Sequence, residues 1–109
     1  MTLERQSSAS DCGVSCLLMI IRYYGGDISK EFLRVLTQTK KDGCDAYHLL
    51  EGARKLGFSC YGVRGDVMAL RSQDFPCIAH VKNSRQADHF VVLTNVEQTS
   101  RRVMMLDPD

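Results

Sequence analysis

The sequence of 109 residues has no tryptophan, only two prolines and no apolar run long enough to cross a bilayer. The longest apolar stretch, residues 14–21, is well short of the roughly 20 residues that a membrane helix needs, and Arg22 follows it. Neither sign of charge dominates, because 14 basic and 13 acidic residues are mixed along the chain. We therefore expect neither a membrane span nor the basic patch with which proteins bind nucleic acid.

Cysteine is present, but not in the pattern of a disulfide scaffold. The five cysteines are an odd number, and no two of them form a Cys-x-x-Cys pair. Near the N-terminus, Glu4 and Arg5 occupy positions where the apolar part of a secretory signal would begin. Together these features favour a reducing, cytosolic setting in which cysteines remain thiols.

Length and composition predict a single domain over residues 1–109, with helices first and strands second. The chain is 44% apolar and 25% charged, as in ordinary globular domains, and no repeat or linker divides it. N-cap residues and apolar periodicity predict helices over residues 12 to about 24, 30 to about 37 and 46 to about 56, after Asp11, Ser29 and Asp45. Their buried faces should hold Val14, Leu17, Leu18, Ile21 and Tyr24, then Phe32, Leu33 and Leu36, then Ala46, Leu49, Leu50, Ala53 and Leu56.

The C-terminal half changes to short apolar runs separated by polar turns. Strands are predicted over residues 58–63, 77–81, 89–96 and 102–106, with a helical turn over 66–71 and turns at 82–88 and 97–100. Connections of hairpin length predict antiparallel pairing, because parallel strands need long crossovers. The fold class is therefore α+β, with N-terminal helices packed on a C-terminal antiparallel sheet.

Cys12 is the first candidate for chemistry. It is predicted at the start of a helix, where unpaired backbone N–H groups and the positive end of the helix dipole favour a thiolate. The thiolate is the nucleophilic form of cysteine. The alternative is a small buried cysteine that only packs.

Two downstream residues could complete a catalytic site with Cys12. His89 opens a strand directly after a polar turn, whereas His48 lies inside a helix and His80 in the middle of a strand. Asp107 follows the last strand and could lie beside His89 if the two strands pair, holding the imidazole in one tautomer. The alternatives are an exposed edge histidine and an Asp-Pro turn.

Gln6 lies a few residues before Cys12, and its amide could donate to a developing oxyanion. The alternative is a polar residue in a loose N-terminal arm. A metal site is a further alternative, since Cys12 and Cys16 lie one turn apart and His89 could join them. No second Cys/His pair at ligand spacing supports it, so we expect no metal and no other cofactor.

Several segments resemble a known family along nearly the whole chain. They are Gln6 with Asp11-Cys12-Gly13, Tyr23-Tyr24-Gly25, Lys55–Phe58, Ala79–Val81, His89–Leu93 and Leu106-Asp107-Pro108. In this order they resemble the cysteine peptidase domain of bacteriocin-processing ABC transporters. Those papain-like domains cut leader peptides after a double glycine.

The resemblance implies a role for each candidate residue. Cys12 would be the nucleophile, His89 the general base and acid, Asp107 the orienting residue and Gln6 the oxyanion donor. The substrate would be a precursor of a bacteriocin or lanthipeptide, whose amphipathic helical leader docks on a surface for which Tyr47, Tyr61 and Met68 are weak candidates.

The resemblance also implies partners and a location. They are the transmembrane and ATP-binding parts of an ABC transporter, at the cytoplasmic face of a bacterial membrane. The family's domain continues beyond its Asp-Pro, so this chain is expected to be a C-terminally trimmed fragment. Cys44-Asp45 replaces the small hydroxyl residues usual in the family. A non-catalytic domain that only docks the peptide is the alternative function.

Overall fold

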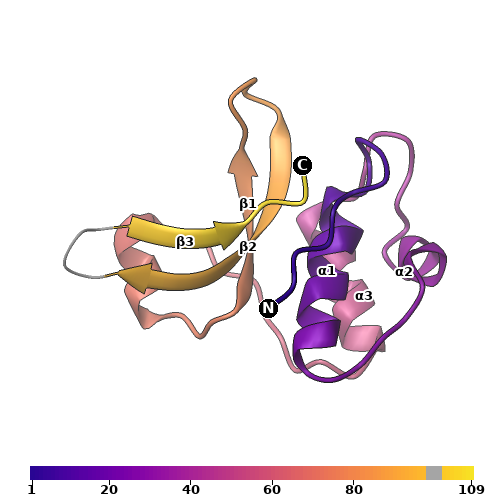
Figure 1. Ribbon diagram of the computed structural model, residues 1–109, viewed down its shortest axis with the longest axis horizontal. Helices are drawn as coiled ribbons and strands as arrows, with labels where there is room; N and C mark the ends of the chain where they lie inside the picture. The colour runs from indigo at the N-terminus through magenta and orange to yellow at the C-terminus, as the bar shows by residue number, and fades with distance from the viewer. Residues whose placement is uncertain (98–101) are drawn as a thin grey trace.

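Three helices and a three-stranded sheet form the two halves of the molecule (Figure 1). The computed structural model describes residues 1–97 and 102–109, and only the backbone of residues 67, 71 and 72. The elements are α1 (Cys12–Tyr23), α2 (Lys30–Leu36), α3 (Ala46–Lys55), the short 3-10 helix η1 (Val67–Ser72), β1 (Cys77–Lys82), β2 (Asp88–Glu97) and β3 (Arg102–Leu106). Helices precede strands and α1 packs on β2, so the predicted α+β class is confirmed.

Helix α1 lies at the centre of the molecule. Every residue from Gly13 to Ile21 is buried, because α2 and α3 cover one side of the helix and β2 covers the other. The helix begins at Cys12 as predicted, but Asp11 makes no side-chain capping bond. The prediction that Tyr24 is buried is wrong: it follows the last helical residue and is exposed at the edge of Phe58.

Helices α2 and α3 begin with the predicted caps. The side chain of Ser29 accepts a hydrogen bond from the N–H of Phe32, and that of Asp45 from the N–H of His48. Phe32 and Ala46 are nevertheless exposed, contrary to prediction. A seven-residue helix contacts its neighbours along a narrow stripe, and in α2 only Leu33 is fully buried.

The sheet is antiparallel, as predicted, and its strand order is β1-β2-β3. In the register, Val81 lies opposite His89, and Val92 opposite Leu106. The predicted turn at residues 97–100 lies outside the described residues except for Glu97, which ends β2.

The prediction of a strand over residues 58–63 is wrong. This segment is irregular and mostly exposed, and its Cys60 carbonyl accepts hydrogen bonds from the Arg54 guanidinium. A strand needs a neighbour to pair with, and among the described residues this segment has none.

The core joins both halves, with Val14, Leu17 and Leu18 of α1 packed together with Phe90 and Val92 of β2. This packing places the beginning of α1 beside the beginning of β2. No helix in the described ranges is long and apolar enough to cross a membrane.

Candidate active site

Cys12 is the first residue of α1 and is half-buried. Its sulfur therefore lies among the unpaired N–H groups of the first turn, at the positive end of the helix. The next residue explains how this turn reaches the sheet. A Cβ on Gly13 would lie 2.8 Å from Cys44 Sγ and 3.4 Å from Phe90 Cδ2. The absence of a side chain at Gly13 thus lets the turn with Cys12 lie directly against the residue that follows His89.

His89 and Asp107 form a hydrogen bond across the end of the sheet. The Nε2 atom of His89 is 2.6 Å from Oδ1 of Asp107, and His89 is only 6% exposed. Burial opposes the charge of Asp107, but its bonds with His89 and with the Asp109 N–H keep the pKa of this carboxyl below its ordinary value. An ionised Asp107 accepts a hydrogen bond from Nε2 and so holds the orientation of the ring, in which Nδ1 is the second nitrogen.

Cys16 shows that the two halves of this site meet. Burial raises the pKa of the Cys16 thiol well above its usual range, and the nearby charges of Cys12, Asp107 and Cys44 raise it further. Cys16 lies one turn after Cys12 on α1 and packs in the buried core with Phe90 and Val92 of β2. The structure therefore brings the first turns of α1 to the strand that carries His89, and the bond from His89 to Asp107 joins the end of β3 to the same strand.

Gln6 lies beside the segment that follows Asp107. Its backbone N–H donates to the carbonyl of Pro108 at 2.9 Å, and the preceding Arg5 donates to the carbonyl of Asp109 at 3.2 Å. The side-chain Oε1 of Gln6 is buried and has no hydrogen-bond partner among the described residues. All four predicted site residues thus come from segments that meet between the two halves.

The Asp11 side chain binds Arg34 instead of capping α1. Arg34 Nε is 2.9 Å from Oδ1 and Nη2 is 2.6 Å from Oδ2, a two-pronged ion pair. Asp11 is 1% exposed, and the hydrogen bonds from Arg34 lower the pKa of its carboxyl. This pair fixes the residue immediately before Cys12. We did not predict Arg34 from the sequence, although its spacing of four residues from Lys30 on α2 places both cations on one helix face.

The other candidates lie outside this arrangement. His48 bonds its own cap, Asp45, at 2.7 Å, and His80 stacks on Phe90 with ring centroids 4.6 Å apart. Tyr47, Tyr61 and Met68 are exposed. All five cysteines are free thiols. Within residues 1–97 and 102–109, no three histidine, cysteine or acidic side chains gather closely enough to bind a metal ion.

Comparison with known proteins gives consistent matches. The model of the peptidase C39 family matches residues 1–109. The pediocin PA-1 transport/processing ATP-binding protein PedD of Pediococcus acidilactici is 34% identical over 106 residues, which are 95% of this chain and 14% of PedD. The lactococcin-G-processing and transport ATP-binding protein LagD of Lactococcus lactis subsp. lactis is 33% identical over 84% of this chain and 13% of LagD.

Two solved structures share the fold. The peptidase domain of Streptococcus ComA, a bifunctional ABC transporter, superposes with a TM-score of 0.86 at 29% identity, over 98% of this chain and 78% of that one. A double glycine motif protease from an AMS/PCAT transporter, solved with a leader peptide, gives 0.86 at 30% identity, over 98% and 73%. These matches confirm the predicted papain-like fold. The chain spans about one seventh of the length of the curated relatives it matches.

Proposed function

This chain belongs to the peptidase C39 family of cysteine peptidases, and from that premise we propose that it removes leader peptides by cutting after a double-glycine motif. Its relatives are bacteriocin processing and transport proteins, and one structural neighbour was solved with its leader peptide. The observation that carries the proposal is the 2.6 Å bond from His89 to Asp107 beside the start of α1.

The proposed reaction uses Cys12 as nucleophile. The sulfur attacks the carbonyl carbon of the second glycine, a thioester forms, and the peptide C–N bond after that glycine breaks. The imidazole of His89 takes the thiol proton on Nδ1 and delivers it to the leaving amine. Water then attacks the thioester, giving up a proton to His89, and the released thiolate recovers its proton. Asp107 holds the ring throughout and balances its positive charge.

Gln6 is proposed as the oxyanion donor. The buried amide oxygen without a partner marks a position that a half-turn of the amide would fill with an NH₂ donor. Together with the backbone N–H groups at the start of α1, this donor would stabilise the negative oxygen of the tetrahedral intermediate.

The proposed substrate specificity requires a narrow groove beside Cys12. A groove with no room for a Cβ would accept glycine and reject larger side chains. The proposed partners are a precursor with an amphipathic helical leader and the membrane and ATP-binding parts of a transporter. The proposed place of action is the cytoplasmic face of the membrane.

The test is incubation with leader–core peptides that end the leader in Gly-Gly, Gly-Ala or Gly-Ser, with products measured by mass. We expect a cut after the second residue of the motif, lost in Cys12→Ala and in His89→Ala. Cys60→Ala is the matched control, because Cys60 is a half-buried cysteine on the irregular segment, and it should cut as the parent does. A Cys12→Ala protein as active as the parent would refute the nucleophile. A parent that binds leaders without cutting them would indicate a docking domain.

A further inference from the structure

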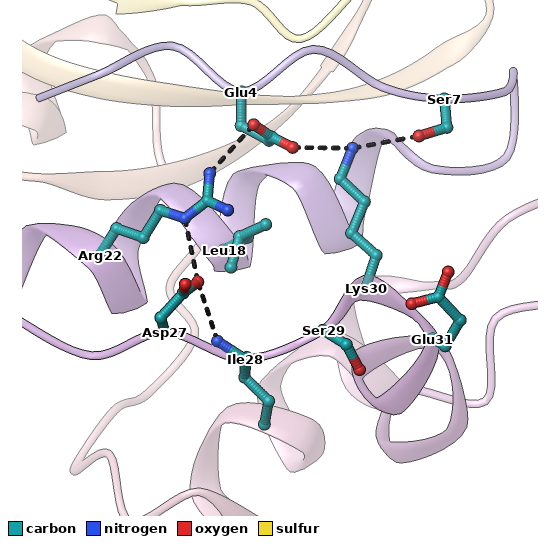
Figure 2. Close-up of a pocket in the computed structure, with 9 residues that line it drawn as sticks. All are labelled: Glu4, Ser7, Leu18, Arg22, Asp27, Ile28, Ser29, Lys30 and Glu31. Carbon is teal, nitrogen blue, oxygen red and sulfur yellow. Dashed lines mark hydrogen bonds and ion pairs between the residues drawn. The ribbon is translucent and has the colours of Figure 1, made fainter.

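Lys30 holds the N-terminal arm, which we define as residues 4–7. Its Nζ donates to the backbone carbonyl of Arg5 at 2.7 Å and to the Ser7 hydroxyl at 3.3 Å, and pairs with the Glu4 carboxylate at 3.2 Å. Figure 2 shows this amine reaching from the start of α2 to Glu4 and Ser7. The Lys30 side chain is only 12% exposed, and that of Glu4 is 27% exposed.

Glu4 shares its carboxylate between two cations (Figure 2). One oxygen pairs with Lys30, and the other accepts from Arg22 of α1 at 3.0 Å. Burial opposes the charge of Glu4, but these two partners hold the pKa of its carboxyl below the ordinary value. Arg22 also binds Asp27 and is 43% exposed, so it is the weaker of the two attachments. Lys30 is therefore the main link between the arm and the helices.

The contact with the Arg5 carbonyl bears directly on Gln6. The carbonyl of Arg5 and the N–H of Gln6 belong to one planar peptide group. Lys30 binds the oxygen of this group, and the Pro108 carbonyl binds its N–H at 2.9 Å. A peptide plane bonded at both ends cannot rotate freely, and it fixes the direction in which the Gln6 side chain leaves the backbone.

This peptide plane also connects the two halves of the active site. Lys30 belongs to α2, in the helical half with Cys12, whereas Pro108 directly follows Asp107 in the sheet half. Figure 1 shows the N-terminal arm beside α1, with both chain ends between the halves. The peptide plane before Gln6 is thus bonded on one side to the helical half, which contains Cys12, and on the other to the residue that follows Asp107.

We propose that Lys30 is a positioning residue for the oxyanion site: through the peptide group of Arg5 and Gln6, it places the Gln6 amide relative to Cys12. The proposal rests on the proposed function and goes beyond it, because Lys30 itself touches no reacting atom. Removing an oxyanion donor outright lowers kcat by about 100- to 1000-fold. Loosening that donor should lower kcat by a part of this range, on the order of 10-fold.

The test is a double-mutant cycle of Lys30→Met and Gln6→Ala, with kcat and KM measured on a leader–core peptide carrying Gly-Gly. Methionine keeps most of the apolar length of lysine but has no donor. We expect Lys30→Met to lower kcat about 10-fold with KM unchanged within about twofold, since the interaction acts in the transition state. In the Gln6→Ala background, Lys30→Met should change kcat less than about twofold, because no amide remains to be positioned.

Two controls separate positioning from stability. Lys30→Arg keeps a charged donor and should recover kcat to within about threefold of the parent. Arg54 lies on α3, and its guanidinium also binds a backbone carbonyl, that of Cys60. Arg54→Met therefore removes a similar contact away from the N-terminal arm, and it should leave kcat unchanged. Thermal unfolding checks that each variant folds. If Lys30→Met does not fold, Lys30→Gln takes its place in the double-mutant cycle.

The outcomes are distinct. Equal losses from Lys30→Met in the parent and in the Gln6→Ala background would refute positioning through Gln6, as would an unchanged kcat. A Gln6→Ala protein with full activity would remove the oxyanion role and the Lys30 proposal, while leaving Cys12 and His89 as the catalytic pair. A parent that cuts no peptide would refute the proposed function itself.

Discussion

The buried ion pair between Asp11 and Arg34 should contribute more to stability than any exposed pair in the molecule. Asp11 is 1% exposed and both of its oxygens bind the guanidinium, at 2.9 and 2.6 Å. Arg34→Met keeps the apolar stem but leaves a buried carboxylate without its cation. Breaking a buried pair in this way costs about 3–5 kcal/mol. The Arg34 side chain is 31% exposed, so water can partly replace it, and we expect the lower end, about 3 kcal/mol.

This loss should be visible in thermal unfolding. At about 4 °C per kcal/mol for a domain of roughly 100 residues, Arg34→Met should lower Tm by about 12 °C at pH 7.5. The matched control is Arg22→Met, which breaks two exposed pairs, with Glu4 and Asp27. Exposed pairs contribute about 0–1 kcal/mol each, so the control should lower Tm by only a few degrees.

The pH dependence of the loss follows from the Asp11 carboxyl. The guanidinium of Arg34 lowers the pKa of Asp11 below its ordinary value of 3.8 in the folded parent. The stabilisation by the pair is therefore complete above about pH 4 and is lost as pH falls through the lowered pKa. Arg34→Met removes the largest cause that lowers the pKa of Asp11, while burial still raises it against the smaller effects of Lys30 and the Ser7 backbone. Asp11 should therefore take up a proton at a higher pH in the variant than in the parent, and this protonation relieves the unpaired charge. The difference in Tm between the parent and Arg34→Met should be largest at neutral pH and should narrow towards pH 4. A Tm difference that stays constant from pH 7.5 to 4 would refute the reasoning, as would a difference no larger than that between the parent and Arg22→Met.

Two further predictions concern the cysteines around α1. Gly13→Ala should destabilise the protein by about 1–3 kcal/mol in urea unfolding, because its Cβ would lie 2.8 Å from Cys44 Sγ. Adding Cys44→Ala to Gly13→Ala should recover most of that loss. If the effects of the two substitutions on stability are instead additive, the strain lies elsewhere, for instance on Phe90. Iodoacetamide at pH 7.5 should leave Cys16 unmodified in the folded protein, because burial raises the pKa of its thiol and only thiolates react. Tandem mass spectrometry of the tryptic peptide 6–22 checks this, and Cys16 modified as fast as in urea would contradict the burial.

Local residue patterns were sufficient to predict most of the secondary structure. Ser29 and Asp45 cap the helices that follow them, and Gly25, with φ +89°, follows the first helix as a stop. These are contacts between residues within a few positions of each other, so the local sequence contains their whole physical cause. Burial was predicted less well: Tyr24, Phe32 and Ala46 fit an apolar helical period but are exposed, because the neighbouring elements cover only part of each helix.

The candidate site likewise combines features that the local sequence predicts with contacts that only the tertiary structure forms. Cys12 at a helix start, His89 at a strand start, Asp107 after the last strand and Gln6 upstream of Cys12 were all predicted from local features, and the resemblance to a peptidase family assigned each of them a role. Antiparallel pairing brings Asp107 at the end of β3 to His89 at the beginning of β2, whereas Cys12 approaches through the packing of α1 on β2. Gln6 is brought in by the bond from its N–H to the Pro108 carbonyl.

The sequence by itself determined where the helices begin, where the strands after residue 76 run, and which residues are candidates for nucleophilic and acid–base chemistry. Only the tertiary structure decided that Asp11 binds Arg34 rather than its own helix, that Lys30 and Pro108 hold the peptide group before Gln6, and that residues 58–63 form no strand. The physical reason is distance along the chain. A cap competes with partners a few residues away, whereas an ion pair or a ladder across tens of residues exists only after the core has packed.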